Sequence, residues 1–284
     1  MKNKATGTVV WTWHIWITND VRDTTYYFQN GGNRQFLDRN IGATTAEIAD
    51  PWINSFGFVY QWGRKDPFIG GDGHSNESAS TASVLSITKN NMIVNTGSEW
   101  KVNPSAATAS FATQNPMTFI CNNTASDNLN VPLDWLSGNN DPSRWADANK
   151  TVNDPCPYGY KVPSQADLGA LYLPDNASWY FKSASLWHWE YFHNNIKRGV
   201  WPAAGMRQGR SYDGGGAQLL CAGTATTRGQ CIYWSSTAAR EWDGAIIRGG
   251  SNRLYTSTTL LSKPYNLDGF GDNVDAYPVR CVKE

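Results

Sequence analysis

Short strand-like runs punctuated by glycine recur through the last third of the chain, at 200–205, 231–237 and 244–248. The 284-residue sequence also contains 14 Trp, 13 Tyr and 26 Gly. Aromatic residues favour strands, and glycine favours turns. The pattern therefore predicts a fold of short strands, tight turns and ordered loops with a few helices, rather than a helix bundle.

Local signals place several elements in the first half. Residues 8–17 alternate apolar and other side chains with a period of two, which predicts a half-buried strand containing His14 as an ordinary strand residue. A second strand is expected at 35–39, after a turn signal. Asp50 and Pro51 offer an N-cap and a first helical residue, so a helix is expected from there to near Gly63.

The middle of the chain, residues 64–150, is rich in Ser, Thr, Asn and Gly and is interpreted as a long insertion with little regular structure. Its GGDGHSNE run at 70–77 departs from the spacing of an EF-hand calcium loop, so a solvated loop is expected. Further along, Ser164 is predicted to cap a helix over 165–172 through the amide of Asp167. A hairpin loop is expected around 213–216.

Charge and hydropathy exclude some partners. The 24 basic and 24 acidic residues cancel, and only 17% of positions are charged, so neither nucleic acid nor an anionic membrane surface is an expected partner. No run reaches the roughly 18 to 20 apolar residues that span a bilayer. The basic start lacks a hydrophobic region, so either a signal was removed or the chain is a fragment of a longer protein, which we favour.

Five cysteines stand at 121, 156, 221, 231 and 281, and none has C-x-x-C spacing, so zinc is not expected. Cys156 and Cys281 would close a long loop if bridged in an oxidising compartment. We predict that their Cα atoms lie within about 7 Å of each other. Two buried free thiols are the alternative.

Six runs occur in a characteristic order: FLDRNIGA (36–43), YQWGRKDPF (60–68), NDPCPYGYKVP (153–163), WPAAG (201–205), YWSST (233–237) and PVRC (278–281). Together they resemble the Fibrobacter succinogenes major paralogous domain of Bacteroidetes surface proteins, over about residues 30–284. The resemblance implies an α+β, C-type-lectin-like fold with small mixed or antiparallel sheets, two helices and long loops. We expect one domain over 1–284, with the strand at 8–17 and a closing strand at 276–282 in its scaffold.

The same resemblance implies an extracellular location at the cell surface, outer-membrane-anchored or fimbrial. It further implies a stalk or pilus-type domain N-terminal to this chain.

A narrower resemblance lies in the IIRGGS run at 246–251, which is similar to formylglycine-generating-enzyme-like domains and to the variable proteins of diversity-generating retroelements. In those variable proteins the stretch that follows forms the binding face. Carried over by position, that stretch is 252–275, within a variable-type segment of about 238–275. The candidate ligand-binding residues are Arg240, Trp242, Asn252, Arg253, Tyr255, Ser257, Tyr265, Asn266, Asp268, Phe270, Asp272 and Asn273.

The sequence gives less support to a catalytic function than to a binding function. No Cys lies between 231 and 281, so the closely spaced thiolates of a copper oxidase are absent there. Ser235 and Ser236 lie in a strand-like run without a nucleophile elbow. A carbohydrate-active hydrolase using a carboxylate pair from Glu190, Glu241 and Asp243 remains the alternative. His188 and His193 lack metal-binding spacing, and aromatic packing is expected for that run.

The sequence therefore predicts a binding domain rather than an enzyme. Aromatic and Arg side chains in a Gly-, Ser- and Asn-rich segment are typical of adaptable protein-binding loops. The sugar-binding motifs of calcium-dependent lectins are missing, so the expected ligand is a protein or a glycan bound without calcium, metal or cofactor. We expect the exposed side chains of 240–275 to form one face.

Overall fold

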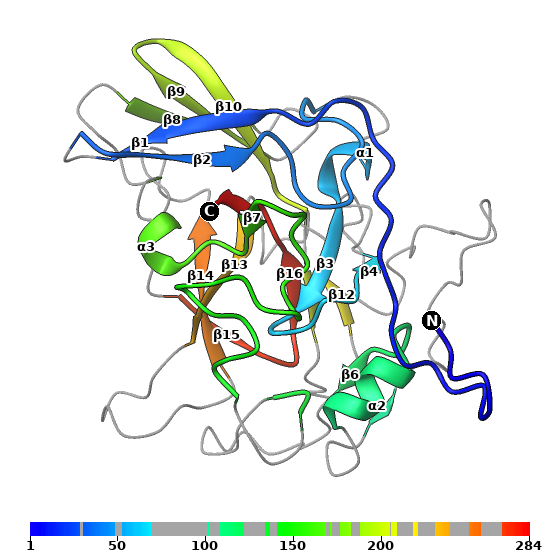
Figure 1. Ribbon diagram of the computed structural model, residues 1–284. Helices are drawn as coiled ribbons and strands as arrows, with labels where there is room; N and C mark the ends of the chain where they lie inside the picture. The colour runs from blue at the N-terminus through cyan, green and yellow to red at the C-terminus, as the bar shows by residue number, and fades with distance from the viewer. Residues whose placement is uncertain are drawn as a thin grey trace.

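The computed structural model describes residues 1–28, 31–48, 53–69, 101–102, 108–121, 134–136, 141–168, 171, 177–182, 188–204, 206–208, 218–220, 231–238, 250–256 and 269–284. The described strands form small and mostly antiparallel sheets, accompanied by a few short helices (Figure 1). The architecture is mixed α and β, compatible with the expected α+β class. None of the described helices is long and apolar enough to cross a bilayer.

The two ends of the chain meet in one four-stranded sheet. Its order is β1 (Asp23–Tyr27), β2 (Asn33–Leu37), β17 (Val282–Lys283) and β7 (Tyr160–Lys161). Val282 lies opposite Phe36 on one side and opposite Lys161 on the other. The strand predicted at 35–39 is therefore confirmed as β2, two residues earlier than expected.

A five-stranded sheet lies beside it. Its order is β12 (Gln218–Leu220), β11 (Met206–Gln208), β16 (Ala276–Pro278), β3 (Phe58–Gln61) and β4 (Phe68–Ile69). The antiparallel pairing of β11 with β12 is that of the predicted hairpin, whose turn at 213–216 lies outside the described residues. The closing strand expected at 276–282 is present as two pieces, β16 and β17.

Three smaller sheets complete the set. They are β10 (Ile196–Pro202), β9 (His188–His193) and β8 (Ala177–Lys182); then β13 (Cys231–Ala238), β14 (Gly250–Thr256) and β15 (Gly269–Asp272); and the parallel pair β5 (Lys101–Val102) and β6 (Ile120–Cys121). In Figure 1 the hairpin β1–β2 and the sheet β8–β10 lie at the top of the view, whereas β6 and α2 (Ala109–Gln114) lie at the bottom.

The helix expected from 50 to 63 is shorter than predicted. Helix α1 covers Ile53–Phe56, and the chain continues directly as β3. Gly57 ends the helix in the left-handed region at a φ of 72°, and a Cβ there would lie 2.4 Å from the Ile41 carbonyl oxygen. Residues 58–61 were assigned wrongly because their pairing with β4 and β16 overrides local helical preference.

Helix α3 (Gln165–Leu168) begins as predicted. The Ser164 hydroxyl accepts a hydrogen bond from the Asp167 amide at 3.1 Å, and the Asp167 carboxylate accepts one from the Ser164 amide at 3.0 Å. This reciprocal arrangement resembles a capping box, with Asp in place of the usual Glu. The predicted end near 172 lies partly outside the described residues.

The runs that carry the family resemblance converge in the core. Arg280 is 1% exposed and donates to the Asn40 side chain and to the Val200 carbonyl, and its guanidinium lies 4.2 Å from the Trp201 ring centre. Asn40 in turn donates to the Tyr233 hydroxyl, which donates to a carbonyl of β10. Four of the six runs are therefore joined by one buried network of hydrogen bonds.

The remaining two runs join the same core. The Trp62 indole donates to the Ser235 carbonyl, and the Trp234 indole donates to the Tyr60 carbonyl. The Ser236 amide donates to the Pro163 carbonyl. These hydrogen bonds to backbone carbonyls form only at a fixed spacing between the segments. The residues of these runs therefore have a structural role.

Cys156 and Cys281 form a disulfide with a Cα–Cα distance of 5.8 Å, which confirms the predicted pairing. Cys281 follows Arg280 in the core, and Cys156 lies in the turn before β7. The bridge thus ties the turn that leads into β7 to the segment that leads into β17, two strands that are neighbours in one sheet.

The predicted strand at 8–17 is wrong. Among the described residues, its segment has one isolated bridge, between Val9 and Lys2, and otherwise runs extended without ladder partners. It is held by side chains instead: the Trp16 indole donates to the Ala43 carbonyl, and the Thr12 hydroxyl donates to Asp66. Alternation predicted an extended backbone correctly, but it carries no information on whether a partner strand is available.

Residues 64–150, interpreted from the sequence as a long insertion, supply several buried side chains to the core. Within the described parts, Phe119 packs edge to face against Phe68, and Trp145 is fully buried against Trp62. Arg64 reaches into the same region and donates to the carbonyls of Asn115 and Thr118. The GGDGHSNE run at 70–77 lies outside the described residues.

Candidate functional site

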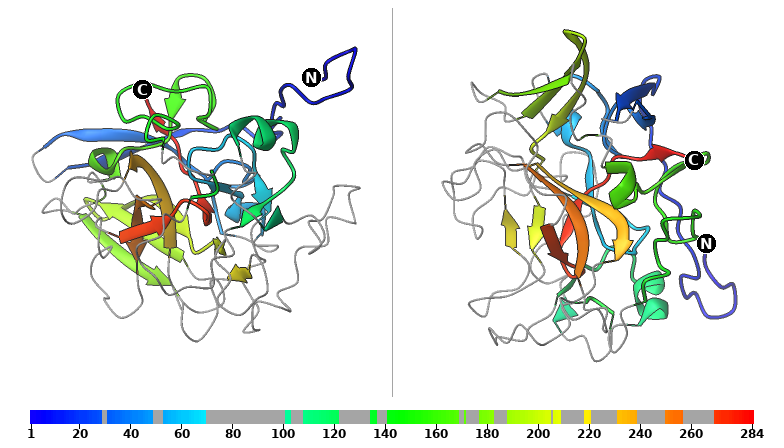
Figure 2. Two further views of the ribbon diagram at one scale, coloured as in Figure 1. Left: turned by 90° about the horizontal axis from the view of Figure 1, so that it is seen from below. Right: turned by 90° about the vertical axis from the view of Figure 1, so that its left-hand side faces the viewer.

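Two strands of the predicted binding segment belong to one sheet. β14 lies between β13 and β15, and the two ladders are antiparallel (Figure 2, right). In this register Asn252 lies opposite Phe270, and Arg253 lies between Trp234 of β13 and Gly269 of β15. Segments separated by about a dozen residues in sequence are therefore neighbours in the sheet.

Strand β13 anchors this sheet to the core. Tyr233, Trp234 and Ser235 are each at most 1% exposed. The Ser236 and Thr237 hydroxyls donate to the carboxylate of Asp147, and the Thr237 hydroxyl accepts a hydrogen bond from the Gln165 amide at the start of α3. The expected strand role of Ser235 and Ser236 is confirmed. A strand with this many fixed partners is a rigid support for its neighbours.

The structure positions the candidate ligand-binding residues unevenly. Asn252, Arg253 and Tyr255 lie on β14, and Phe270 and Asp272 lie on β15. The other candidates, apart from Asn273, lie outside the described residues: Arg240, Trp242, Ser257, Tyr265, Asn266 and Asp268. The backbone register therefore brings five of the predicted residues to one two-stranded unit.

The structure contradicts the prediction that Asn273 belongs to the exposed binding face. Its side chain is 2% exposed, and its amide donates to the Asp134 carboxylate at 3.0 Å. Asp275, at the end of the proposed variable stretch, is also buried and accepts a hydrogen bond from the Tyr277 hydroxyl. Residues 273–282 are buried, so Asn273 and Asp275 do not belong to an exposed binding face.

Of the three carboxylates named for the hydrolase alternative, Glu190 alone lies within the described residues. Glu190 lies on β9, 3.3 Å from the Lys197 ammonium and 3.8 Å from His188. Glu241 and Asp243 lie outside the described residues. His193 stacks on Tyr27 with ring centres 3.9 Å apart, which confirms aromatic packing for that His. Within the described part of the chain, no group of three His, Cys, Asp or Glu residues could hold a metal ion.

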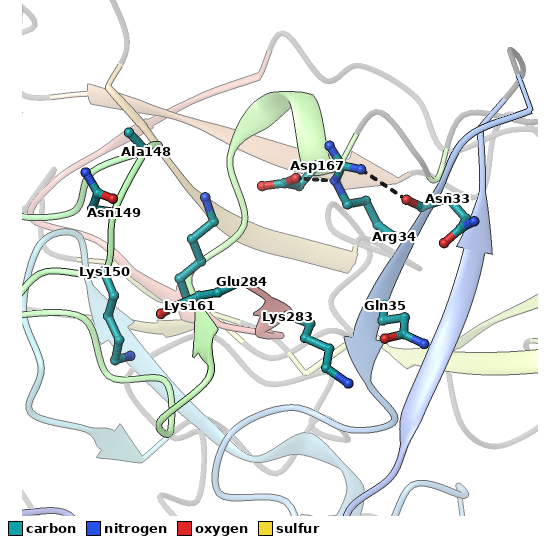
Figure 3. A pocket seen from close by; sticks show the side chains of 10 residues that line it. All are labelled: Asn33, Arg34, Gln35, Ala148, Asn149, Lys150, Lys161, Asp167, Lys283 and Glu284. Atoms are coloured by element: carbon teal, nitrogen blue, oxygen red, sulfur yellow. Dashed lines mark hydrogen bonds and ion pairs between the residues drawn. The ribbon is translucent and has the colours of Figure 1, made fainter.

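A pocket lies over the four-stranded sheet, away from the candidate ligand-binding residues (Figure 3). The sequence gave no reason to expect it. It has a volume of about 720 Å³ and is bordered by β2, β7, β17, the first turn of α3 and the loop at 148–150. Its walls come from three stretches far apart in sequence, 33–35, 148–167 and 283–284, so no local motif could have revealed it.

One wall of the pocket holds the ion pair of Arg34 and Asp167. The Arg34 Nε donates to the Asp167 Oδ1 at 2.8 Å. Burial of Asp167 favours a raised pKa, but hydrogen bonds from Arg34 and Ser164 outweigh burial and hold the pKa of this carboxyl below its usual value. The helix cap identified in the sequence therefore also fixes a pocket cation.

Comparison with known proteins gives no relatives: no protein-family model, curated protein or solved structure matches this chain.

Proposed function

We propose that this chain is a ligand-binding, receptor- or adhesin-type domain of C-type-lectin-like fold from a bacterial surface protein. The sheet of β13, β14 and β15 would present the contact residues, without metal or cofactor. The ligand would be a protein or glycan on another cell or surface. The segment at about 238–275 resembles the diversified segment of retroelement variable proteins. We therefore include in the proposal that its side chains vary between copies of the gene, while the strands that support it stay the same.

The single observation that carries the proposal is that β14 pairs with the buried strand β13 and β15 pairs with β14, so both candidate segments belong to a sheet that the core supports. Side chains of a binding surface can vary in sequence only where other residues hold the backbone in place. Here the β13 core contacts supply that support, whereas the candidate residues Asn252, Arg253, Tyr255 and Phe270 belong to the two following strands, β14 and β15.

The disulfide supports the proposed extracellular location. Structural disulfides persist in oxidising compartments and are rare in a reducing cytosol. Cys156 and Cys281 join the two turns that lead into β7 and β17, so their bridge belongs to the scaffold. This placement fits an exported domain. The family resemblance further implies that a stalk or pilus-type domain precedes this one in the protein.

The test is a glycan and protein array, screened first with the unaltered protein. Once a ligand is found, Tyr255→Ala and Tyr265→Ala should each weaken binding by about 1–3 kcal/mol, as truncation of interface aromatics does. The control is Tyr158→Ala, since Tyr158 is 99% exposed and lies far from these strands in the sequence. Melting temperatures should change little in all three variants.

Two outcomes would contradict the proposal. If Tyr255→Ala and Tyr265→Ala unfold the domain, these rings belong to the core and the binding face lies elsewhere. If any array member is cleaved, and cleavage is lost in Glu190→Gln, Glu241→Gln or Asp243→Asn, the chain is a hydrolase.

A further inference from the structure

The pocket over the four-stranded sheet has a rigid frame. β17 pairs with β2 on one side and with β7 on the other, and the disulfide joins the turns that lead into β17 and β7. The start of α3 is fixed to β13 through the Gln165 amide and the Thr237 hydroxyl. A preformed cavity of about 720 Å³ lies within the size range of small-molecule sites.

The lining of the pocket is polar. Among the described residues that line the pocket, only Ala148 is apolar. Four lining residues are cationic, namely Arg34, Lys150, Lys161 and Lys283, against two acidic ones, Asp167 and Glu284. Binding sites for apolar ligands need hydrophobic walls, which this pocket lacks. Three of the four cations bond to a carboxylate: Arg34 to Asp167, Lys150 to Asp154 and Lys283 to Asp23. The ammonium of Lys161 is the charge that a ligand carboxylate would meet first.

Lys150 is committed to the scaffold. Its ammonium donates to the Asp154 carboxylate at 2.9 Å and to the carbonyls of Cys156 and Tyr160. These three contacts use the three donors of an ammonium group. Lys150 therefore contributes its charge to the pocket but has no donor left for a ligand.

Arg34 and Lys161 keep donors in reach of the pocket. Arg34 uses its Nε for Asp167 and one terminal nitrogen for the Asn33 carbonyl, and its side chain is about half exposed. Lys161 donates to the Asp147 carbonyl, and Lys283 donates to Asp23 at 2.8 Å. Figure 3 shows the Lys161 ammonium directed toward the side of Asn149 and Asp167, and the Lys283 ammonium directed away from it.

Neutral hydrogen-bonding groups lie between these cations. Asn33, Gln35 and Asn149 each offer an amide with both donors and acceptors, the groups that recognise hydroxyls. The combination of separated cations and amides fits a ligand that carries both carboxylate and hydroxyl groups. Because the carboxylate would meet partly exposed cations, the attraction should be strongest at low ionic strength.

We propose that this pocket binds a small polyhydroxylated carboxylate of the uronic-acid class, with Lys161 and Arg34 as its cationic contacts. This site is separate from the sheet of β13, β14 and β15, so it stands whether or not that sheet binds a ligand.

The experiment is isothermal titration of the whole chain with trigalacturonate, with the neutral galactotriose and with citrate, a carboxylate that is not a sugar. Trigalacturonate should bind, and its affinity should fall as NaCl is raised from about 50 to 500 mM. Galactotriose should not bind detectably. Citrate binding as tightly as trigalacturonate would show that the pocket selects charge alone, which overturns the uronic-acid assignment.

Substitutions locate the binding. Lys161→Ala should weaken trigalacturonate binding about tenfold or more, because it removes a charge-assisted hydrogen bond. Lys283→Ala should weaken it less, because the Lys283 ammonium donates to Asp23. Lys4→Ala removes the same charge at an exposed position outside the pocket and should leave binding unchanged. The unaltered protein failing to bind at millimolar concentration, or equal affinities in all three variants, would overturn the proposal. Tyr255→Ala should bind trigalacturonate normally, which separates this site from the proposed receptor-binding sheet.

Discussion

Arg144 and Asp134 form an ion pair whose side chains are 4% and 3% exposed. The Arg144 guanidinium also lies 4.8 Å from the Trp135 ring centre, and Asn273 donates to the same carboxylate. A buried ion pair adds little over an apolar pair, but removal of one partner leaves the other charge buried and uncompensated. The three residues therefore depend on one another.

We expect Asp134→Ala to lower the free energy of unfolding by about 3–5 kcal/mol, measured by urea denaturation. Asp20→Ala serves as the control, because Asp20 is exposed and pairs only at 3.7 Å with the exposed Arg22. The control should stay within about 0.5 kcal/mol of the unaltered protein. A loss below about 1 kcal/mol for Asp134→Ala would show that Arg144 reaches water in its absence.

Asp167 gives a pH-dependent prediction. Its pKa is lower in the folded protein than in the unfolded chain, so its ionised form stabilises the fold above the unfolded pKa of about 4. That contribution is lost as the pH falls through the folded pKa. Asp167→Asn should therefore be less stable at pH 7 and should show a shallower loss of stability between about pH 5 and pH 2. Equal slopes in thermal melts across that range would contradict the assignment.

At the scale of elements, the extended segment 10–18 has two unlike sides. Trp16 packs against buried residues of the core and donates to the Ala43 carbonyl, whereas Trp13, Ile15 and Ile17 are 68%, 79% and 84% exposed. His14 lies against Phe58 and Tyr60 on the inner side. Burial of His14 lowers its pKa, although Asp66 acts in the opposite direction. The alternation visible in the sequence thus separates anchoring residues from exposed ones.

A pair of matched substitutions tests this division. Trp16→Ala should cost about 1–3 kcal/mol of unfolding free energy, since a partly buried indole and its hydrogen bond are lost. Trp13→Ala should change stability by less than about 0.5 kcal/mol, because its ring is mostly exposed. Chemical denaturation of both variants checks the difference. Similar losses for the two would mean that the outer side is covered as well.

At the scale of the whole molecule, the disulfide joins residues 125 positions apart. Closing so long a loop restricts the unfolded chain, and removal of a native bridge typically costs about 2–5 kcal/mol. Cys156→Ser combined with Cys281→Ser should therefore lower stability by that amount, measured as denaturation midpoints with and without dithiothreitol. The reductant should destabilise the unaltered protein but not the double variant. A double variant that still responds to the reductant would place the sensitive bridge elsewhere.

Much of the core was accessible from the sequence. The runs at 36–43, 60–68, 233–237 and 278–281 carry the family resemblance, and buried hydrogen bonds of Asn40, Trp62, Tyr233 and Arg280 join them. The strand β2, the cap at Ser164 and the disulfide pairing were also predicted. Each rests on a strong local signal or on two cysteines in conspicuous motifs.

The sequence by itself determined that 35–37 is strand and where α3 begins, and it indicated that Cys156 and Cys281 are neighbours, because backbone propensity, capping chemistry and motif context act over a few residues. Only the tertiary structure decided that 10–18 lies unpaired among the described residues, that 58–61 is strand rather than helix, and that Asn273 is buried. It alone brought Arg34, Lys161, Asp167 and Lys283 to one pocket. Strand pairing and burial depend on residues distant in the chain, and hydrophobic pattern does not specify which partners meet.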